Sequence, residues 1–419
     1  MKVLLLARSG KALQKMFDVK LVNSQSDIPR ELWDACFPPP LEGRWWYETL
    51  ERSLLHEQFQ FSYAVLIQES HPVGIAPLFF MQLPLDMIVP DNLLKVGAFI
   101  DKLSPTFLRP PTLFVGSPCS DEGHVGLMPG IDRRGALLCL QDTLKSYARA
   151  HRARILIWKD FPEDWNNDFG WLMKKRRLFR SVSYPGTVVD LASAVKEDYF
   201  SRLKTSRRQH LRRDLKLSSQ RIDVHVEVVQ RPDTSTLDEL FALFMQTFIH
   251  AEIKFEQLNR QFFELISEQP VSYFILLRDG DSNRVVAFNL CFLMDTHVIN
   301  KFIGIDRTLP KNFLLLVRLW DAVLGWSLAH GAKTIQSGQT GYSTKIKTGH
   351  RLVPLNNYGQ VFNVVFHALF RFVGERITWK NLDADLATAI AADPGIGIKT
   401  REAKDHVRRS SVIMPVAMW

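Results

Sequence analysis

The segment from residue 272 to residue 337 constrains the fold of this chain most strongly. Its first part is rich in β-branched and aromatic side chains and is broken by short Asp, Gly and Asn turns, which predicts three antiparallel strands in meander order. These strands are residues 272–278, 285–294 and 297–305. An apolar-striped helix is predicted at residues 311–330, ending at Gly331, and residues 333–337 return as a strand. This order predicts an α+β domain with a mixed, mostly antiparallel sheet.

The rest of the chain repeats this organisation more loosely. Helices at residues 196–220, 237–250 and 258–268 and a strand at residues 222–229 are predicted upstream of the meander. The first half has a similar order of strands and helices, interrupted by an irregular Pro- and Gly-rich stretch at residues 83–130. We therefore predict two tandem units, each with a mixed sheet flanked by helices, followed by a helical extension. The predicted units are residues 1–190 and 191–360, the second holding the active cleft, and the extension is residues 361–419.

Size and composition set the broad class of the protein. The chain has 419 residues, 46% of them apolar and 23% charged, which is enough to form the cores of two or three domains. Cys36, Cys119, Cys139 and Cys291 lie far apart among apolar neighbours, which predicts reduced thiols in a cytoplasmic protein. The apolar run at the N-terminus ends at Arg8, too early for a signal peptide. The sequence contains no window of about 18 apolar residues, so no membrane-spanning helix is predicted.

Four segments of the sequence carry more specific information. Residues 199–213 join an aromatic pair to an arginine cluster, and residues 258–265 form a helix with two adjacent phenylalanines. Residues 287–290 and 302–306 belong to two paired central strands, the second of which ends in an aromatic-x-Gly-x-Asp pattern. Residues 337–349 are a glycine-rich turn with a Lys-x-x-x-Gly ending. Together, in this order, they resemble the GNAT superfamily of acyltransferases and especially its FemAB-like branch, which has two tandem units.

The resemblance implies a reaction and a place for it. A substrate amine would attack a thioester or ester, and backbone N–H groups of a central strand would stabilise the oxyanion. That strand would hold Phe288, Asn289 and Leu290. The donor would be an acyl-CoA, a carrier-bound acyl group or an aminoacyl-tRNA. Members of the superfamily that use acetyl-CoA usually have a glycine-containing pyrophosphate loop before the long helix. Residues 306–312, at the matching position, contain no glycine, so this chain departs from the pattern of coenzyme A binding.

Two polar residues near the expected cleft are candidates for catalysis. Asn289 lies in an apolar strand, where a buried amide needs partners, so it either orients a substrate or ties down a neighbouring loop. Asp306 ends the next strand, and it either binds the acceptor amine and takes its proton or caps the following helix. The sequence leaves these alternatives open.

The glycine-rich turn, residues 337–349, is the candidate binding site for an anion. An extended backbone would project Lys345 and Lys347 to one side, next to glycine N–H groups that suit a phosphate or carboxylate. Gln339 and Tyr342 could add hydrogen bonds to the same ligand. The alternative is a solvated turn with ordinary surface lysines.

A basic helix lies just upstream of these elements. Residues 202–216 carry seven Lys or Arg and one Asp, and Arg207 falls close enough to the apolar stripe to point inward at an anion. The whole chain has 53 Lys and Arg, 44 Asp and Glu and a net charge of +9, which favours anionic partners such as a tRNA. A solvated basic face is the alternative. No interleaved aromatic residues predict base stacking, and nothing predicts DNA binding.

The sequence as a whole predicts an N-acyltransferase with acyl-CoA or aminoacyl-tRNA as co-substrate and a small-molecule or peptide amine as acceptor. No permanently bound cofactor and no metal site are expected. Two alternatives stay open. One is a non-catalytic GNAT-like protein that binds a phosphate-bearing ligand. The other is a peripheral envelope-synthesis protein that docks on anionic membrane through residues 202–216 or residues 361–373. Residues 361–373 are otherwise predicted to form a largely buried helix.

Overall fold

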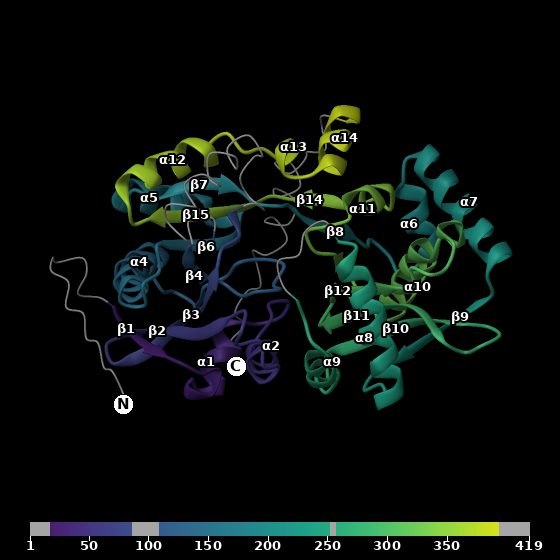
Figure 1. The fold of residues 1–419 in the computed structure, drawn as a ribbon, viewed down its shortest axis with the longest axis horizontal. Helices are drawn as coiled ribbons and strands as arrows, with labels where there is room; N and C mark the ends of the chain where they lie inside the picture. The colour runs from purple at the N-terminus through teal and green to yellow at the C-terminus, as the bar shows by residue number, and fades with distance from the viewer. Residues whose placement is uncertain (1–16, 86–108, 252–256, 394–419) are drawn as a thin grey trace, which may run out of the picture.

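Two β-sheets lie side by side in the molecule, each covered by helices (Figure 1). The computed structural model describes residues 17–85, 109–251 and 257–393. The first sheet has eight strands, one of which, β5 (Gly126–Leu127), pairs with β3 off the main path. In order, the others are β1 (Asp18–Val22), β2 (Gln60–Gln68), β3 (His71–Gln82), β4 (Pro111–Val115), β6 (Ile155–Pro162), β15 (Leu355–Val361) and β7 (Phe179–Val182).

The second sheet has seven strands and contains the predicted meander. In order, they are β14 (Arg351–Val353), β8 (Gly186–Asp190), β13 (Thr334–Gln336), β12 (His297–Ile305), β11 (Val285–Met294), β10 (Ser272–Asp279) and β9 (Val224–Val229). The three meander strands begin and end within a residue of the predicted positions, because their turns hold the Asp, Gly and Asn residues that break a strand. Two mixed sheets flanked by helices confirm the predicted α+β class and tandem arrangement.

Each sheet contains a parallel pair of neighbouring strands joined by a long helix. In the first sheet, α4 (Arg133–Ala150) connects β4 to β6, and its first turn is capped by Asp132, which accepts from two backbone N–H groups. In the second sheet, α10 (Leu315–Ala329) connects β12 to β13. The chain therefore repeats one architecture, and the two parallel pairs are equivalent positions in the two units.

The remaining helices cover the sheets and the junction between them. They are α1 (Arg30–Cys36), α2 (Arg44–Arg52), α5 (Asn166–Arg176), α6 (Lys196–Arg202), α7 (Thr205–Arg221), α8 (Thr234–Ile249), α9 (Arg260–Ser267), α11 (Tyr342–Lys347), α12 (Val364–Gly374), α13 (Trp379–Leu382) and α14 (Ala384–Ala392), with 3-10 turns at Gln25–Asp27, Glu163–Trp165 and Lys311–Phe313. The predicted single helix 196–220 is wrong, because the extended backbone of Leu203 separates α6 from α7.

The two halves of the chain exchange strands. Strands β7 and β8 flank a short loop at Pro185 and enter different sheets. Strand β8 pairs with β13 and β14, while β15, late in the chain, lies between β6 and β7 of the first sheet. The predicted chain boundaries at 190/191 and 360/361 stay a prediction, but the sheets themselves are divided differently.

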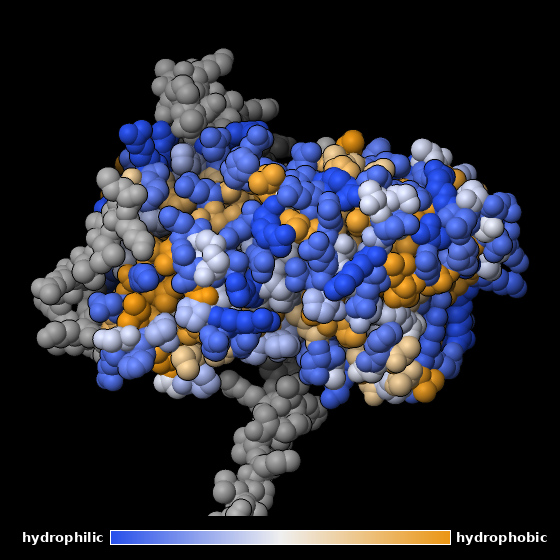
Figure 2. Space-filling view, turned by 90° about the horizontal axis from the view of Figure 1, so that it is seen from below, coloured by the Kyte–Doolittle hydropathy of each residue, from blue (hydrophilic) through white to orange (hydrophobic). Residues whose placement is uncertain are grey.

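A shared aromatic core joins the units. The rings of Trp46 and Phe262 lie 5.9 Å apart, and Trp45 packs edge-on against Phe292 at 5.0 Å. The Asn259 amide donates to the carbonyl of Ser53 at 2.6 Å, which fixes α9 against α2. The lower face of the molecule, seen in Figure 2, is a mosaic of polar side chains with smaller apolar patches.

One helical segment of the described residues, Lys311–Ala329, is long and apolar enough to cross a membrane by length and composition alone. It packs on the second sheet, where Leu319, Val323 and Leu324 are buried in the core. Its apolar character is therefore that of a core helix. The sequence criterion did not identify it, because the apolar residues of this segment are interrupted by polar ones.

Candidate active site between the two sheets

Strands β12 and β13 separate at the centre of the molecule. They are parallel and pair at only three positions, His297 with Thr334, Val298 with Ile335 and Ile299 with Gln336. Beyond this point β12 continues to Ile305 while β13 ends. A β-bulge lies at the point of separation, since Leu290 pairs with Phe302 and Cys291 with Asn300, which leaves Lys301 as the extra residue.

The open edge belongs to β12. The N–H of Asp306 donates to Val286 of β11 at 2.9 Å, whereas the N–H of Ile305 points away and donates to Thr247 Oγ1 at 3.1 Å. In an antiparallel pair the N–H groups of successive residues point alternately toward the partner strand and away from it. The N–H of Ile303, two residues before Ile305, therefore also points away from β11. The expectation that β11, with Asn289, supplies free backbone donors is wrong, because β11 is paired along both edges.

Lys301 points from the bulge toward two carboxylates of the first unit. Its Nζ lies 2.6 Å from Glu42 Oε1, 3.2 Å from Asp121 Oδ1 and 4.8 Å from the centre of the Trp46 ring. The lysine side chain is 1% exposed and each acidic side chain 10% exposed. Burial lowers the pKa of Lys301, but the charges of Asp121 and Glu42 outweigh it, so the pKa is raised and the ammonium persists.

Asp121 connects the two strands where they part. One carboxylate oxygen accepts from Lys301 of β12, and the other accepts from the Gln336 amide of β13 at 3.4 Å. Gly338 lies directly beside it, since a Cβ on this glycine would be 3.7 Å from Asp121 Oδ1 and 4.0 Å from Lys345 Nζ. A loop of the first unit thus supplies a charged group to the opening of the second sheet.

Glu122 is a second acidic group on the same loop. Burial, together with the neighbouring carboxylates of Asp121, Asp164 and Glu42, raises its pKa to about 7. The residue is half-buried, so solvent reaches it. Within the described part of the chain its carboxylate has no hydrogen bond or ion pair. Glu122 therefore combines a pKa near neutrality with a free carboxylate, as a general base requires.

The glycine-rich turn folds as a short helix. Gly338, Gly341 and Gly349 have φ of +55°, +68° and +85°, in the left-handed region that favours glycine, and α11 lies between the last two. The predicted extended backbone is therefore wrong. Two residues apart on a helix, Lys345 and Lys347 point in different directions, the first inward and the second into solvent.

Lys345 lies against the polar cluster. Its Nζ donates to the carbonyl of Ser337, and burial lowers its pKa to about 8 although Asp121 opposes the shift. His350 holds this arrangement, because its Nε2 lies 3.0 Å from Ser337 Oγ and its Nδ1 lies 3.0 Å from the carbonyl of Lys345. Burial lowers the pKa of His350 to about 3, so the imidazole stays neutral. The structure thus brings Lys345, but not Lys347, to the site.

The side chains of Gln339 and Tyr342 form hydrogen bonds with backbone carbonyls. The Gln339 amide donates to the carbonyl of Tyr184 at 3.1 Å, and the Tyr342 hydroxyl donates to the carbonyl of Pro185 at 2.8 Å. Tyr342 is fully buried. Both side chains therefore fix the glycine turn to the β7–β8 connection, and their predicted ligand contacts stay predictions.

Asn289 and Asp306 are held by neighbouring residues. Asn289 is buried, and its amide donates to Asn300 on β12 and to the carbonyl of Leu290 at 3.2 Å. Asp306 accepts from the N–H of Thr308 at 2.9 Å and forms an ion pair with Arg284 at 2.8 Å. It follows Lys301 by five residues, roughly 16 Å along a strand. These contacts are those of the structural alternatives, and the catalytic roles of both residues stay predictions.

Arg207 remains available to a ligand. It is half-buried on α7, and no hydrogen bond or ion pair to a described residue holds its guanidinium. Its neighbours on the helix are engaged, since Arg208 donates to the carbonyl of Ser201 at 3.3 Å and Arg212 pairs with Glu197. The predicted inward position of Arg207 is compatible with its partial burial.

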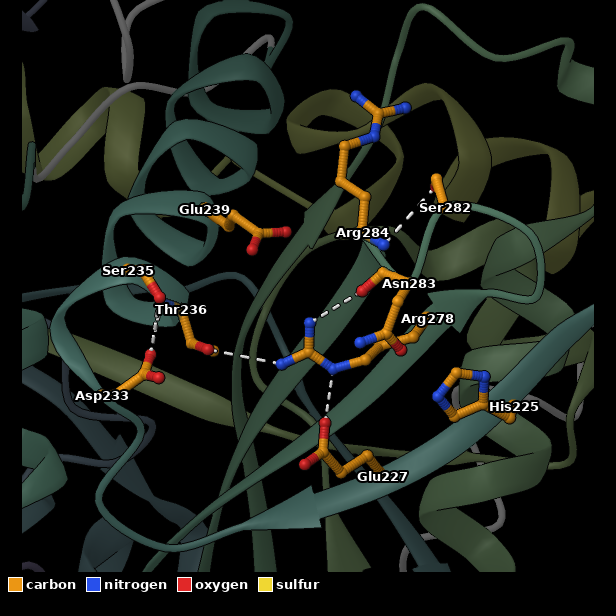
Figure 3. A pocket seen from close by; sticks show the side chains of 10 residues that line it. All are labelled: His225, Glu227, Asp233, Ser235, Thr236, Glu239, Arg278, Ser282, Asn283 and Arg284. Carbon is orange, nitrogen blue, oxygen red and sulfur yellow. Dashed lines mark hydrogen bonds and ion pairs between the residues drawn. The ribbon is translucent and has the colours of Figure 1, made fainter.

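A polar hollow of about 500 Å³ is lined by side chains of β9, β10, the start of α8 and the β10–β11 turn (Figure 3). Its central residue, Arg278, donates to Asn283 O at 3.0 Å and to Thr236 Oγ1 at 3.3 Å. Arg278 is also paired with Glu227, and Asp233 accepts from the N–H of Thr236 at 2.7 Å. Both arginines of the lining are paired, Arg278 with Glu227 and Arg284 with Asp306, whereas the carboxylates of Asp233 and Glu239 accept from backbone N–H groups.

Sequence analysis missed the four residues that meet between the sheets. They are Glu42, Asp121, Glu122 and Lys301. Three lie in loops or turns of the first half, where nothing local marks them. Lys301 could have been identified, because it is the one charged residue between Val298 and Ile305. The region predicted as irregular holds the acidic loop, and residues 86–108 of that region lie outside the described residues. No group of three His, Cys, Asp or Glu within the described ranges is arranged to hold a metal ion.

The fold and the separated parallel strands define a class of protein. Among solved structures, FemX is similar, with a TM-score of 0.54 and 12% identity over 84% of this chain and 100% of FemX. A second structure, L-PGS from Bacillus licheniformis, has a TM-score of 0.48 and 11% identity over 77% of this chain and 91% of that chain. A third, a tandem GNAT protein from the clavulanic acid biosynthesis pathway, has a TM-score of 0.45 and 11% identity over 82% of this chain and 98% of that chain. The similarity to FemX shows that this chain has the same two-unit fold.

A family model matches the second half of the chain. Residues 181–376 match the FemAB-like family, described by peptidoglycan biosynthesis and recognition. No curated protein sequence matches the chain. The FemAB-like, GNAT-type fold predicted from four short segments is confirmed.

Proposed function

We propose that this protein is an N-acyltransferase that transfers an acyl or aminoacyl group to an amine at the point where β12 and β13 separate. The observation that carries the proposal is the position of Asp121. It contacts both separating strands, and it brings the acidic loop of the first unit to the open edge of the second sheet.

The open edge of β12 suits the donor. With the donor carbonyl beside this edge, the N–H of Ile303 would point toward the oxygen that becomes negative during attack. Both proposed donors, acyl-CoA and aminoacyl-tRNA, carry phosphates, and the unpaired Arg207 is the proposed contact for them. The glycine-free segment 306–312 offers no glycine cradle, so we leave the choice of donor to experiment.

The acidic groups suit an amine acceptor. Glu42 and Asp121 are engaged by Lys301, which leaves the ionised form of Glu122 as the group that would attract the amine. The free amine nitrogen would attack the carbonyl carbon, the C–N bond would form, and the C–S or C–O bond to the donor would break. Glu122 would take the proton that the attacking nitrogen loses, which its pKa of about 7 permits at neutral pH. This chemistry requires no resident cofactor, and we place it in the cytoplasm.

A panel of donors and amines tests the proposal. Purified protein is incubated with acyl-CoA or aminoacyl-tRNA, and thiol release or deacylation is followed with and without each amine. We expect release that depends on the amine and is lost in Glu122→Gln and in Lys345→Ala but retained in Lys347→Ala.

Binding without turnover would favour a different function. If a wide panel gives no amine-dependent release while phosphate-bearing ligands still bind, the protein is a non-catalytic GNAT-like binding protein and the proposal is wrong. Loss of that binding in Arg207→Ala would then locate the ligand on α7.

A further inference from the structure

Helix α12 exposes apolar side chains that a soluble surface normally hides. Val364 is 82% exposed and Val365 76% exposed, and Leu369 and Phe372 are exposed by 46% and 55%. Together with Ala368 these residues lie on one face of the helix, at positions i, i+1, i+4, i+5 and i+8. Of the ten large hydrophobic side chains exposed in the described part of the chain, these four are concentrated on a single helix of 11 residues.

The opposite face of α12 is apolar as well. Phe366 and Phe370 pack against the large hydrophobic core, and Gly374 lies so close to β7 that an added Cβ would be 3.1 Å from Arg180 O. The only charged side chain within the helix is Arg371. A helix that is apolar all round is expected to be covered on all sides. Here the protein covers one side only.

Basic residues border the exposed face. Arg376 stacks on the Phe372 ring, with its guanidinium carbon 3.5 Å from the ring centre, and Arg149 lies 5.1 Å from the ring of Phe362, just before the helix. Arg177, exposed at the end of α5, contacts His367 of α12 through its backbone. Arg371 is paired with Glu375 at 3.0 Å, so this pair adds no net charge to the border. In Figure 1, α12 and α5 lie together at the upper left, on the side away from the face in Figure 2.

We propose that α12 is a membrane-docking helix that lies in the surface of an anionic lipid bilayer, with Val364, Val365, Ala368, Leu369 and Phe372 inserted among the acyl chains and the bordering arginines on lipid phosphates. An apolar stripe beside basic side chains is the composition of helices that lie in the plane of a membrane interface. This inference does not depend on the proposed transferase activity.

The alternative occupants fit less well. The helix is roughly 16 Å long, and a stable protein–protein interface needs about 800 Å² from each partner, more than one short helix face provides. A second copy would also bring its own basic border against this one. The basic helix α7 is the other membrane candidate, but none of its side chains is among the exposed large hydrophobics, so it has no residues to insert.

Vesicle co-sedimentation of the full-length protein tests the inference. We expect binding to vesicles of equal parts phosphatidylglycerol and phosphatidylcholine at low salt, weaker binding as salt rises, and little binding to phosphatidylcholine alone. The double variant Leu369→Asp, Phe372→Asp should bind about tenfold more weakly or less, because two inserted side chains become charged. Both positions are exposed, so circular dichroism and the melting temperature should stay unchanged.

Two control variants make the result specific to α12. Leu54→Asp changes another side chain that is 57% exposed, and Arg208→Ala with Arg212→Ala removes charges from α7, so both should bind like the unmodified protein. Equal binding of the Leu369→Asp, Phe372→Asp variant, or loss of binding only in the α7 variant, would overturn the inference. So would no binding of the unmodified protein at low salt, or a dimer that this double variant dissociates in the absence of lipid binding.

Discussion

The carboxylate of Glu122 is the single group on which the proposed proton transfer depends. Only the ionised carboxylate can accept a proton. Because burial raises the pKa of Glu122 to about 7, the ionised fraction increases as the pH rises through neutrality. Because the pKa of Glu122 is raised, this carboxylate binds a proton more tightly in the folded protein than in the unfolded chain, at pH values between the ordinary glutamate pKa and about 7. The stability contributed by Glu122 therefore falls as the pH rises through that range.

Glu122→Gln is predicted to lower kcat/KM about 100-fold or more and to remove a rise in rate centred near pH 7. Initial rates measured across a pH series test this. Glu264→Gln, at a position with a 62% exposed side chain, is the matched control and should retain both rate and pH profile. An unchanged ascending limb in Glu122→Gln would mean that another group titrates.

The two lysines of the glycine turn should behave differently. Burial lowers the pKa of Lys345 to about 8, so below that pH the folded protein holds a charged ammonium at a cost in stability. The cost disappears as the pH rises from about 8 toward 10.5. Lys345→Met is therefore predicted to raise the free energy of unfolding at pH 7 by about 1–2 kcal/mol, allowing for its lost hydrogen bond, while lowering activity. Lys347→Met should change neither the free energy of unfolding nor the activity. Urea denaturation measures the first quantity and rate assays measure the second. A Lys345→Met variant that is destabilised would contradict the burial argument.

At the scale of elements, the meander was predictable because each strand is long, apolar and ended by turn residues. The turn at residues 337–349 was not, because its glycines signal positive φ without saying that six residues between them form a helix. Strand β15 was missed for a similar reason, since Asn356, Asn357 and Gly359 are poor strand formers and only pairing with β6 and β7 makes them extended.

The conformation of the glycine turn gives a prediction about stability. Gly349 has positive φ, and a Cβ there would lie 2.5 Å from Leu203 Cδ2, so Gly349→Ala should destabilise the protein by about 2 kcal/mol. Gly170, within α5, has no heavy atom within 4 Å of an added Cβ, so Gly170→Ala should instead stabilise by about 0.5–1 kcal/mol. Chemical denaturation of both variants measures the difference. Equal effects would show that residues 337–349 do not hold this conformation.

At the scale of the whole molecule, the exchange of β8 and β15 makes the two units interdependent. A sequence read in order places β8 with the first unit and β15 with the second, because propensities carry no information on which sheet a strand joins. The same limit explains why the site was predicted only in part. Lys345 could be found from the glycine turn, but Glu42 and Asp121 reach Lys301 from more than 150 residues away in the chain, which no local pattern encodes.

Two truncations test this interdependence. Ending the chain after residue 354 removes β15 and leaves β6 and β7 with unpaired edges, so we expect loss of the first sheet and aggregation. Ending it after residue 376 keeps α12 and all strands of the described residues, so both sheets should form. Circular dichroism and hydrogen exchange on the two truncated chains distinguish these outcomes. A stable, protected first sheet in the shorter chain would show that β15 is dispensable.

The central claim is that acyl transfer takes place where Asp121 of the first unit meets the separating strands of the second. The most direct measurement is amine-dependent release from acyl-CoA or aminoacyl-tRNA by the unmodified protein, Glu122→Gln, Asp121→Asn and the control Glu264→Gln, with each variant shown to be folded. We predict release by the unmodified protein and the control, and loss of about 100-fold or more in the two acidic-loop variants. Amine-dependent release that both acidic-loop variants retain in full would contradict this account.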